Sequence, residues 1–482
     1  MKTLWKTLAA CTLLAVVALV SVSETQGADL VYFGATVGGP TGATLWKYDT
    51  GTNTASSVEG VLEQVDSIAV DGSHVYAGIR VPGQGIVKRY THAGSPEDIQ
   101  LGLSTVESLA VSDSRLYASL SADVNGLIKH YPKTAPFIHG GIDGDLETGI
   151  GANKEIIVSS DGNTLYAAIP IPAGGGIKQY DVTDPFSSVG SDFEFGQGTG
   201  NMHLDETAGR LVAGFDGNMG VTKSYSLPAG SGVTNNEFSV GNAFAPAVTS
   251  GQTSNGLKVF TLISAGNGIL KQYDMLAPVG GGDGDIANGL CGTNGCPTAL
   301  GDGHIQYANG KLYALFNDSP VGTGSGGILK SWDVDGPIPD VGNLNPTDVS
   351  PGGQGDPLML ELVGDLLFMG TSGSGGTLRV YDTATELFIH ESFGYGDFTA
   401  FGSASLSGDF DGDVDGDGDV DGDDFLEWQR TDGTASGLAA WQTNYGAGAL
   451  AGAIAAASAV PEPSSAALVA IATTLWMRRR RK

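Results

Sequence analysis

The feature that most constrains the fold of this 482-residue chain is a repeat of about 48 residues, which recurs eight times within residues 29–405. Each copy contains a short apolar run that ends in a turn, a second run such as residues 75–79, a glycine-rich gap, and a third run such as residues 85–90 that closes on an aromatic. Successive closing aromatics are 41 to 59 residues apart, and they are Tyr48, Tyr90, Tyr131, Tyr180, Tyr225, Tyr273, Trp332 and Tyr381. A fixed period of this length indicates stacked copies of one supersecondary unit.

The composition of each copy predicts β-strands. Apolar residues alternate with period two, and turn pairs such as Asp71-Gly72 and Asn309-Gly310 bound the runs. This alternation and these turns exclude the helical solenoids, and the 75 glycines of the chain further disfavour packed helices. Four short strands with their turns take up the ~40–50 residues of one β-propeller blade. We therefore expect an all-β protein with a β-propeller over residues 29–405.

The two ends of the repeat region predict how the ring closes. The first copy starts directly at Leu30 and lacks a preceding strand, while an unpaired strand over residues 398–405 follows the eighth copy. Pairing these two ends in one blade would remove the exposed sheet edges. We expect eight blades, with seven as the alternative if the irregular region 226–259 does not form a full blade.

The closing motif of the last copy also fits this architecture. Residues 376–382, with the sequence GTLRVYD, resemble blades of WD-repeat, quinoprotein-like and surface-layer propellers. The histidine signature of WD repeats does not recur, so the resemblance implies the architecture and carries no partner over.

A cation stands two residues before the aromatic in seven of the eight copies, at Lys88, Lys129, Lys178, Lys223, Lys271, Lys330 and Arg379. Two interpretations are open. The cations could form a basic ring that binds an anionic polysaccharide, or they could lie far from the axis, with packed aliphatic stems and charged tips that reach water or a local Asp.

The pairs Asp143/Asp145 and Asp283/Asp285 are likewise either calcium-binding loops or simple Asp-Gly turns.

A dense acidic segment after the repeats predicts a calcium site. The sequence DVDGDGDVDGDD, which starts at Asp413, has the oxygen-ligand spacing of a 12-residue calcium loop with Gly418 at the sharp turn. In this register the ligand positions fall on Asp413, Asp415, Asp417, Asp419, Asp421 and Asp424. The alternative is a solvated acidic linker.

The residues after the loop extend this prediction. Residues 424–430 predict a short helix that presents Phe425 and Trp428 on one face. Loop and helix resemble a type I dockerin repeat, so we expect a dockerin-like EF-hand module over residues 409–446. The second repeat is degenerate: Trp441-Gln442 echoes Trp428-Gln429, but its loop keeps only Asp432. We expect one Ca²⁺, and a cohesin-like surface protein is a possible partner.

Both ends of the chain carry sorting signals. Residues 1–28 combine two lysines, an uncharged apolar stretch and small residues, as in a secretory signal peptide. Residues 460–482 contain Pro-Glu-Pro, an apolar run and five terminal cations, and they resemble a PEP-CTERM sorting signal. That resemblance implies transient membrane insertion through a hydrophobic tail helix, processing by an exosortase-type enzyme, and delivery to the envelope, outer surface or extracellular matrix. An ordinary tail anchor is the alternative, and residues 447–459 form an Ala/Gly linker before this tail.

Charge and cysteine content limit the partners further. The formal net charge of −29 would repel the phosphates of nucleic acids, so we expect no nucleic-acid partner. In an oxidising location, Cys291 and Cys296 are expected to form a loop disulfide and not a metal site.

Two classes of function remain open. The first is an exported, non-catalytic binding or structural protein of the envelope or exopolysaccharide matrix. The second is a polysaccharide-active enzyme, a glycoside hydrolase or lyase with a dockerin-like module. No nucleophile motif occurs and the seven histidines occupy unrelated repeat positions, so we assign no catalytic residue; His139, Asp143, His203 and His304 are the first to inspect.

Overall fold

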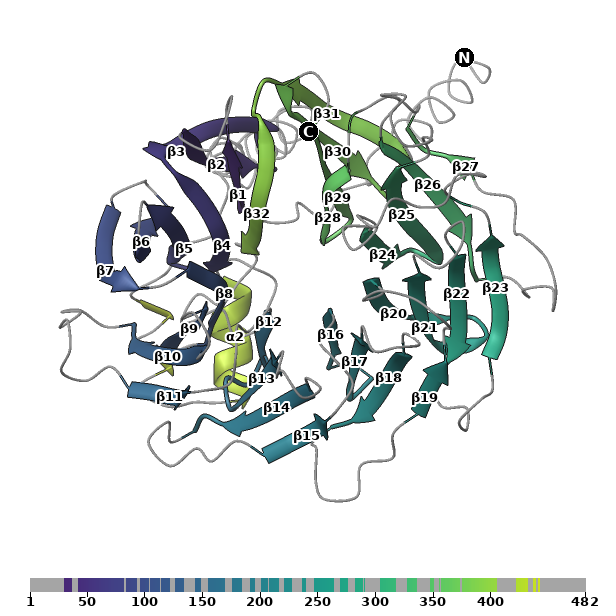
Figure 1. Cartoon of the computed structure of the whole chain (residues 1–482), viewed down its shortest axis with the longest axis horizontal. Helices are drawn as coiled ribbons and strands as arrows, with labels where there is room; N and C mark the ends of the chain where they lie inside the picture. The colour runs from purple at the N-terminus through teal and green to yellow at the C-terminus, as the bar shows by residue number, and fades with distance from the viewer. Residues whose placement is uncertain are drawn as a thin grey trace, which may run out of the picture. The chain divides into compact units, whose positions relative to one another are not determined.

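In a computed structural model, the repeat region forms eight four-stranded antiparallel sheets arranged as the blades of a ring (Figure 1). The structure describes most of residues 30–404, with gaps that fall mainly in the loops, and residues 422–431, 437–438 and 441–442. Two compact units are present: residues 30–404 form one, and the two ends of the chain form the other. The prediction of eight blades is confirmed, and the seven-blade alternative is wrong.

Each blade contains four strands, which are named in order from the innermost to the outermost. Blades 1 to 4 contain β32 (Asp397–Ala404), β1 (Leu30–Thr36), β2 (Ala43–Asp49) and β3 (Thr54–Leu62); β4 (Gln64–Val70), β5 (His74–Val81), β6 (Gln84–Thr91) and β7 (Pro96–Leu103); β8 (Thr105–Val111), β9 (Arg115–Ser121), β10 (Leu127–Pro132) and β11 (Gly144–Thr148); and β12 (Glu155–Val158), β13 (Thr164–Ile169), β14 (Gly176–Asp181) and β15 (Ser191–Phe195).

Blades 5 to 8 contain β16 (Met202–Asp205), β17 (Arg210–Phe215), β18 (Val221–Ser226) and β19 (Asn236–Ser239); β20 (Ala247–Thr253), β21 (Gly256–Ile263), β22 (Ile269–Asp274) and β23 (Gly282–Asn288); β24 (His304–Ala308), β25 (Lys311–Asn317), β26 (Gly327–Asp333) and β27 (Thr347–Asp348); and β28 (Pro357–Val363), β29 (Leu366–Thr371), β30 (Thr377–Asp382) and β31 (Leu387–Phe393). The innermost strands β32, β4, β8, β12, β16, β20, β24 and β28 contact one another in that circular order.

The ring closes as the sequence predicted. The last strand, β32, pairs with β1 in blade 1, with Phe401 opposite Phe33 and Phe398 opposite Ala35. The rings of Phe33 and Phe398 lie 5.4 Å apart between their centroids. The irregular region 226–259 supplies β19 and β20, and these strands complete blades 5 and 6.

The inner turns of the blades show why Asp-Gly and Asn-Gly pairs recur. Between β24 and β25, Asn309 and Gly310 have φ angles of 51° and 76°, a left-handed conformation that Gly and Asn adopt most easily. Between β4 and β5, the Oδ1 atom of Asp71 accepts hydrogen bonds from the backbone N–H groups of Ser73 and His74 at 2.8 and 2.7 Å. Each such turn reverses the chain in very few residues and so sets the register of the next strand.

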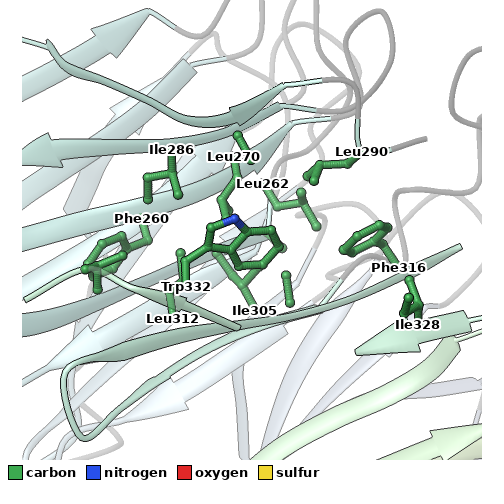
Figure 2. Close-up of a cluster of buried hydrophobic side chains, with 14 residues drawn as sticks. Phe260, Leu262, Leu270, Ile286, Leu290, Ile305, Leu312, Phe316, Ile328 and Trp332 are labelled. Carbon is green, nitrogen blue, oxygen red and sulfur yellow. The ribbon is translucent and has the colours of Figure 1, made fainter. Parts of the chain in front are cut away.

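The hydrophobic core consists of layers between neighbouring blades. Figure 2 shows the layer between blades 6 and 7, where the Trp332 indole from β26 is surrounded by Phe260, Leu270, Ile305 and Leu312 from strands of both blades. All eight closing aromatics are buried, and six of them have no exposed surface: Tyr48, Tyr90, Tyr131, Tyr180, Tyr225 and Trp332. The sequence period is therefore the spacing of the large side chains that fill these layers.

The second compact unit contains the helix α2 (Gly422–Thr431), which confirms the short helix expected at residues 424–430. The ring of Phe425 lies 5.4 Å from that of Trp428 and 4.8 Å from that of Trp441, centroid to centroid. Residues 437–438 and 441–442 are also helical. Among the described residues, no helix combines the length and apolar composition needed to cross a membrane.

Candidate functional site

The innermost strands line the centre of the ring, and acidic residues are the charged residues that their sequences contain. None of these eight strands contains Lys or Arg. They do contain carboxylates in six blades, namely Asp66, Glu107, Glu155, Asp205, Glu361 and Asp397. We call the surface formed by these innermost strands the acidic centre.

One position on the innermost strands links blades 2, 3 and 4 each to the next blade. This position pairs with the residue that stands two places after the central aromatic of the second strand. It is occupied by Ser67 in blade 2, Ser108 in blade 3, Glu155 in blade 4 and His304 in blade 7. The Oγ of Ser67 donates to the carbonyl of Val106 at 3.4 Å, and the backbone N–H of Ile156 donates to Ser108 Oγ at 3.2 Å. Side chains at this position thus hold the neighbouring innermost strand through its backbone.

Glu155 is the charged member of this set. Its Oε2 accepts a hydrogen bond of 2.7 Å from the backbone N–H of Met202 in blade 5. Burial raises the pKa of Glu155 to about 7, and the Met202 hydrogen bond opposes this shift. The carboxyl group therefore changes charge near neutral pH.

Glu361 lies in blade 8, on the opposite side of the ring from blade 4, which carries Glu155. Gln306 Nε2 donates to Glu361 Oε2 and to the carbonyl of Leu360, both at 3.3 Å. Burial, followed by the charge of Glu155, raises the pKa of Glu361 to about 7. The charge of Glu155 thus adds to the pKa shift of Glu361, which lies in a different blade.

Asp66 and Glu107 occupy equivalent β-bulges in β4 and β8. Asp66 forms an ion pair with Arg80, with Oδ1 and Nη2 3.1 Å apart. Burial raises the pKa of Asp66 to about 6; Arg80 opposes this shift and the charge of Glu107 adds to it. In blade 2 the charge of Asp66 is thus balanced by Arg80, and blade 3 contributes Glu107.

Two of the four residues singled out from the sequence lie on innermost strands, His203 in β16 and His304 in β24. Burial lowers the pKa of both imidazoles, that of His304 to about 4, so both rings are neutral at pH 7. Within the described part of the chain, His304 Nε2 has no hydrogen-bond partner. His139 and Asp143 lie outside the described residues, as do Cys291 and Cys296.

The seven repeated cations are on the third strand of blades 2 to 8, away from the centre, and each lies opposite an acidic residue of the outermost strand. The register pairs are Lys88 with Asp98, Lys129 with Asp145, Lys178 with Asp192, Lys223 with Glu237, Lys271 with Asp285, Lys330 with Asp348, and Arg379 with Glu391.

Ion pairs at three of these cations support the packing interpretation. Lys88 Nζ lies 2.9 Å from Glu59 Oε1 of the neighbouring blade, Lys330 Nζ lies 3.5 Å from Asp348 Oδ1, and Arg379 pairs with Glu391. The interpretation of these cations as a basic, ligand-binding ring is not supported. Asp145, Asp283 and Asp285 lie in strands β11 and β23, so their prediction as loops or turns is wrong.

The predicted calcium ligands are not tested by the structure. Asp413, Asp415, Asp417, Asp419 and Asp421 lie outside the described residues, and Asp424 lies in α2. Among the described residues alone, no group of three or more His, Cys, Asp or Glu side chains is arranged to hold a metal ion.

Sequence reasoning missed the pair Glu155 and Glu361 and their neighbour Gln306. The copies can be aligned on the central aromatic of the second strand, so that equivalent positions of the innermost strands are compared. Gln306 and Glu361 then occupy the same position as Ala69 and Ala110, and this difference could have identified them from the sequence. A large polar residue at a position where two other blades have alanine is a departure from the repeat.

Comparison with known proteins supports the fold alone. No family model and no curated protein matches the chain. Among solved structures, it is similar to the dihydro-heme d1 dehydrogenase NirN, with a TM-score of 0.54 and 12% identity over 78% of this chain and 75% of that chain. It is also similar to the Dos1 propeller, with a TM-score of 0.50 and 14% identity over 78% and 95% of the two chains. The chain is thus an eight-bladed β-propeller protein, a fold whose neighbours differ widely in function.

Proposed function

We propose that this chain is an exported, non-catalytic binding protein of the cell envelope or exopolysaccharide matrix, in which the propeller presents the ligand-binding surface. The observation that carries the proposal is the acidic centre, whose innermost strands supply six carboxylates and no Lys or Arg. Such a surface attracts cationic groups and accepts hydrogen bonds from hydroxyls, whereas it repels polyanions. The preferred ligands are therefore neutral or amine-bearing glycans, and uronic-acid glycans bind only where Ca²⁺ bridges the charges.

A glycan array with residues 29–447, run with and without Ca²⁺, tests this proposal. Binding of amine-bearing or neutral glycans in the absence of Ca²⁺ is expected, and Glu361→Gln should reduce binding of the amine-bearing ones. Thr249→Val at the equivalent position of blade 6 is the matched uncharged control. Binding of uronic-acid glycans alone, without Ca²⁺, would contradict the proposal.

One observation favours a second candidate function, a glycoside hydrolase or lyase. Burial raises the pKa of both Glu155 and Glu361 to about 7, and carboxyl groups with raised pKa values act as acids and bases in glycoside hydrolysis. A reducing-sugar assay on glycans that bind in the array separates the two functions. Release of new reducing ends that disappears in Glu155→Gln and Glu361→Gln would replace the binding proposal with the enzymatic one.

The proposal includes the two sorting signals. Residues 1–28 act as the signal peptide, and residues 460–482 act as the PEP-CTERM-type tail that an exosortase-type enzyme removes. Intact-mass measurement of the chain isolated from the envelope or culture medium should give a product that lacks both segments. A product that retains residues 460–482 would support the tail anchor instead.

We also propose that residues 409–446 bind one Ca²⁺ through Asp413, Asp415, Asp417, Asp419, Asp421 and Asp424. The contact of Trp441 with Phe425 supports a two-helix module of dockerin type below the loop. Calorimetry on residues 29–447 should give one site, which is lost in Asp413→Ala/Asp424→Ala. Unchanged calcium binding in that variant would refute the register. A cohesin-like surface protein is the corresponding candidate partner.

A further inference from the structure

A serine and a histidine on the outermost strand of blade 8 share a short hydrogen bond. Ser392 and His390 stand two residues apart on β31, opposite Leu378 and Val380 of β30, and therefore point to the same face of the sheet. His390 Nε2 and Ser392 Oγ are 2.7 Å apart, and both side chains are half-buried. A serine within hydrogen-bond reach of a basic nitrogen can act as a nucleophile when a third group orients the base.

The third group is the backbone of Asn53, in the turn between β2 and β3 of blade 1. The hydrogen bond between this backbone and the His390 ring raises the pKa of the ring, so the histidine donates in it. Because Nε2 is engaged with Ser392, the donor is Nδ1, and Nε2 accepts from the Ser392 hydroxyl. The Oδ1 atom of Asn53 accepts a 3.1 Å hydrogen bond from the Tyr48 hydroxyl, which fixes the turn. His390 is thus held in the tautomer that can take a proton from Ser392.

Two further features favour removal of that proton. The single hydroxyl proton of Ser392 points to His390, so the Tyr395 hydroxyl donates to Ser392 Oγ, at 2.9 Å. A donor at this oxygen stabilises the negative charge that develops as the proton leaves. Burial lowers the pKa of His390 below its usual range, and the Asn53 hydrogen bond opposes this shift. The ring is therefore neutral at pH 7 and can accept a proton.

The junction between blades 8 and 1 departs from the repeat at this position. In blade 1 the residue equivalent to Ser392 is Glu59, since both lie opposite the residue three places before the closing aromatic. Glu59 forms the ion pair with Lys88 of blade 2. Blade 1 is the copy without a repeated cation, and Trp46 stands in the place of that lysine. The Trp46 ring lies 4.9 Å from the ring of Tyr395, centroid to centroid. At this junction a serine and an aromatic pair thus occupy the positions of an ion pair.

The serine lies on a strand that is open to solvent. As the outermost strand of its blade, β31 pairs with β30 alone. Four of its apolar side chains are exposed: Leu387, Phe388, Ile389 and Phe393. Leu387, at 63% exposure, lies opposite Asp382 and so shares the face of His390 and Ser392. A small molecule can therefore approach this face from the edge of the sheet and meet an apolar side chain there.

We propose that Ser392 is a nucleophile that accepts the acyl group of a carboxylic ester, with His390 as its general base. In this step a bond forms between Ser392 Oγ and the carbonyl carbon, and the bond from that carbon to the alkoxy oxygen breaks. The hydroxyl proton passes to His390 Nε2 and then to the departing oxygen, so an O-acyl serine and an alcohol are formed. The proposal concerns one acylation per chain, without turnover, and it does not depend on ligand binding at the acidic centre.

Acylation of residues 29–447, which contain every described residue, by 4-nitrophenyl acetate tests the proposal. Release of 4-nitrophenolate gives the rate, and mass mapping of peptides identifies the acylated residue. Ser392 should be acylated at least about tenfold faster than Ser57. Ser57 is an exposed serine on β3, the outermost strand of blade 1, so this comparison within the wild-type chain controls for exposure alone.

Three variants separate the roles of the side chains. Ser392→Ala should remove acylation from the β31 peptide. His390→Gln should slow acylation of Ser392 by about a hundredfold or more, the range of general-base catalysis. Ser57→Ala is the matched control and should leave the rate at Ser392 unchanged. Thermal midpoints of the variants report whether each one folds as the wild type does.

Two results would overturn the inference. The first is a wild-type chain in which Ser392 is acylated no faster than Ser57. The second is a His390→Gln variant that has the wild-type thermal midpoint and acylates Ser392 at the wild-type rate. If His390→Gln lowers the thermal midpoint, the comparison of the two serines in the wild type decides.

Discussion

Replacing Glu361 by glutamine should make the propeller more stable above neutral pH and leave its stability nearly unchanged at pH 5. Glutamine has the shape of the protonated carboxyl group but does not ionise. In the folded protein, burial and the Glu155 charge raise the pKa of Glu361 to about 7, whereas in the unfolded chain the pKa has its ordinary value of 4.5. Glu361 thus holds its proton more tightly in the folded state, and its favourable contribution to stability is lost as pH rises from 4.5 through 7.

The size of this effect follows from the pKa difference. The full difference corresponds to about 3 kcal/mol at 1.36 kcal/mol per pKa unit. The side chain keeps some contact with solvent, which screens the charge, so we expect about 1–2 kcal/mol. Within this range, Glu361→Gln should raise the thermal midpoint at pH 8.5 by a few degrees.

Scanning calorimetry of residues 29–447 at pH 5, 7 and 8.5 measures the difference between wild type and variant. Thr249→Val, at the same position in blade 6, carries no titratable group and is the control for packing changes. Glu155→Gln should also lower the pKa of Glu361, because the charge that raises it is removed. A wild-type-to-variant difference that stays constant from pH 5 to 8.5 would refute the account of a buried, titrating carboxyl group.

The remaining predictions concern packing and ion pairs. In a denaturant titration, Gly376→Ala should lower the unfolding free energy by more than about 3 kcal/mol, because a Cβ there would lie 1.9 Å from the carbonyl oxygen of Gly396. Gly375→Ala is the control, since Gly375 has a similar φ angle and a Cβ there would have no neighbour within 4 Å. This control should lower the unfolding free energy by about 1 kcal/mol. Phe398→Ala should remove about 3 kcal/mol by opening a cavity in the closing blade, and a thermal midpoint equal to wild type would contradict this role of β32. A double-mutant cycle of Lys88→Met and Glu59→Gln should give a coupling energy of about 1 kcal/mol that decreases with salt, whereas zero coupling would show that this interblade ion pair contributes nothing.

The repeated pattern carried most of the information about the fold. The closing aromatics, the period-two alternation and the Asp-Gly and Asn-Gly turns are local features, and local features determine strand length, turn position and the face of each residue. The missing first strand and the unpaired last strand were sufficient to predict the pairing of β32 with β1. The length of region 226–259 obscured the blade boundary there, because loops of variable length hide the period.

The candidate site was less accessible from the sequence. His203 and His304 were singled out, but as histidines and not as members of the innermost strands. Glu155 and Glu361 were not recognised, because each is an ordinary glutamate in a strand of apolar residues. For the repeated cations, spacing alone left two interpretations open, and only the cross-strand register opposite acidic residues decided between them.

The amino-acid sequence by itself determined the β class, the repeat, the blade unit and the position of the closing strand, since these follow from backbone preferences and from side-chain alternation within about 50 residues. Only the tertiary structure decided which carboxyl groups are buried on the innermost strands, which cations are neutralised and which edge strand presents apolar side chains to solvent. These properties depend on distances between residues of different blades. Those distances, and the burial that shifts the pKa of Glu361, exist only once the ring has closed.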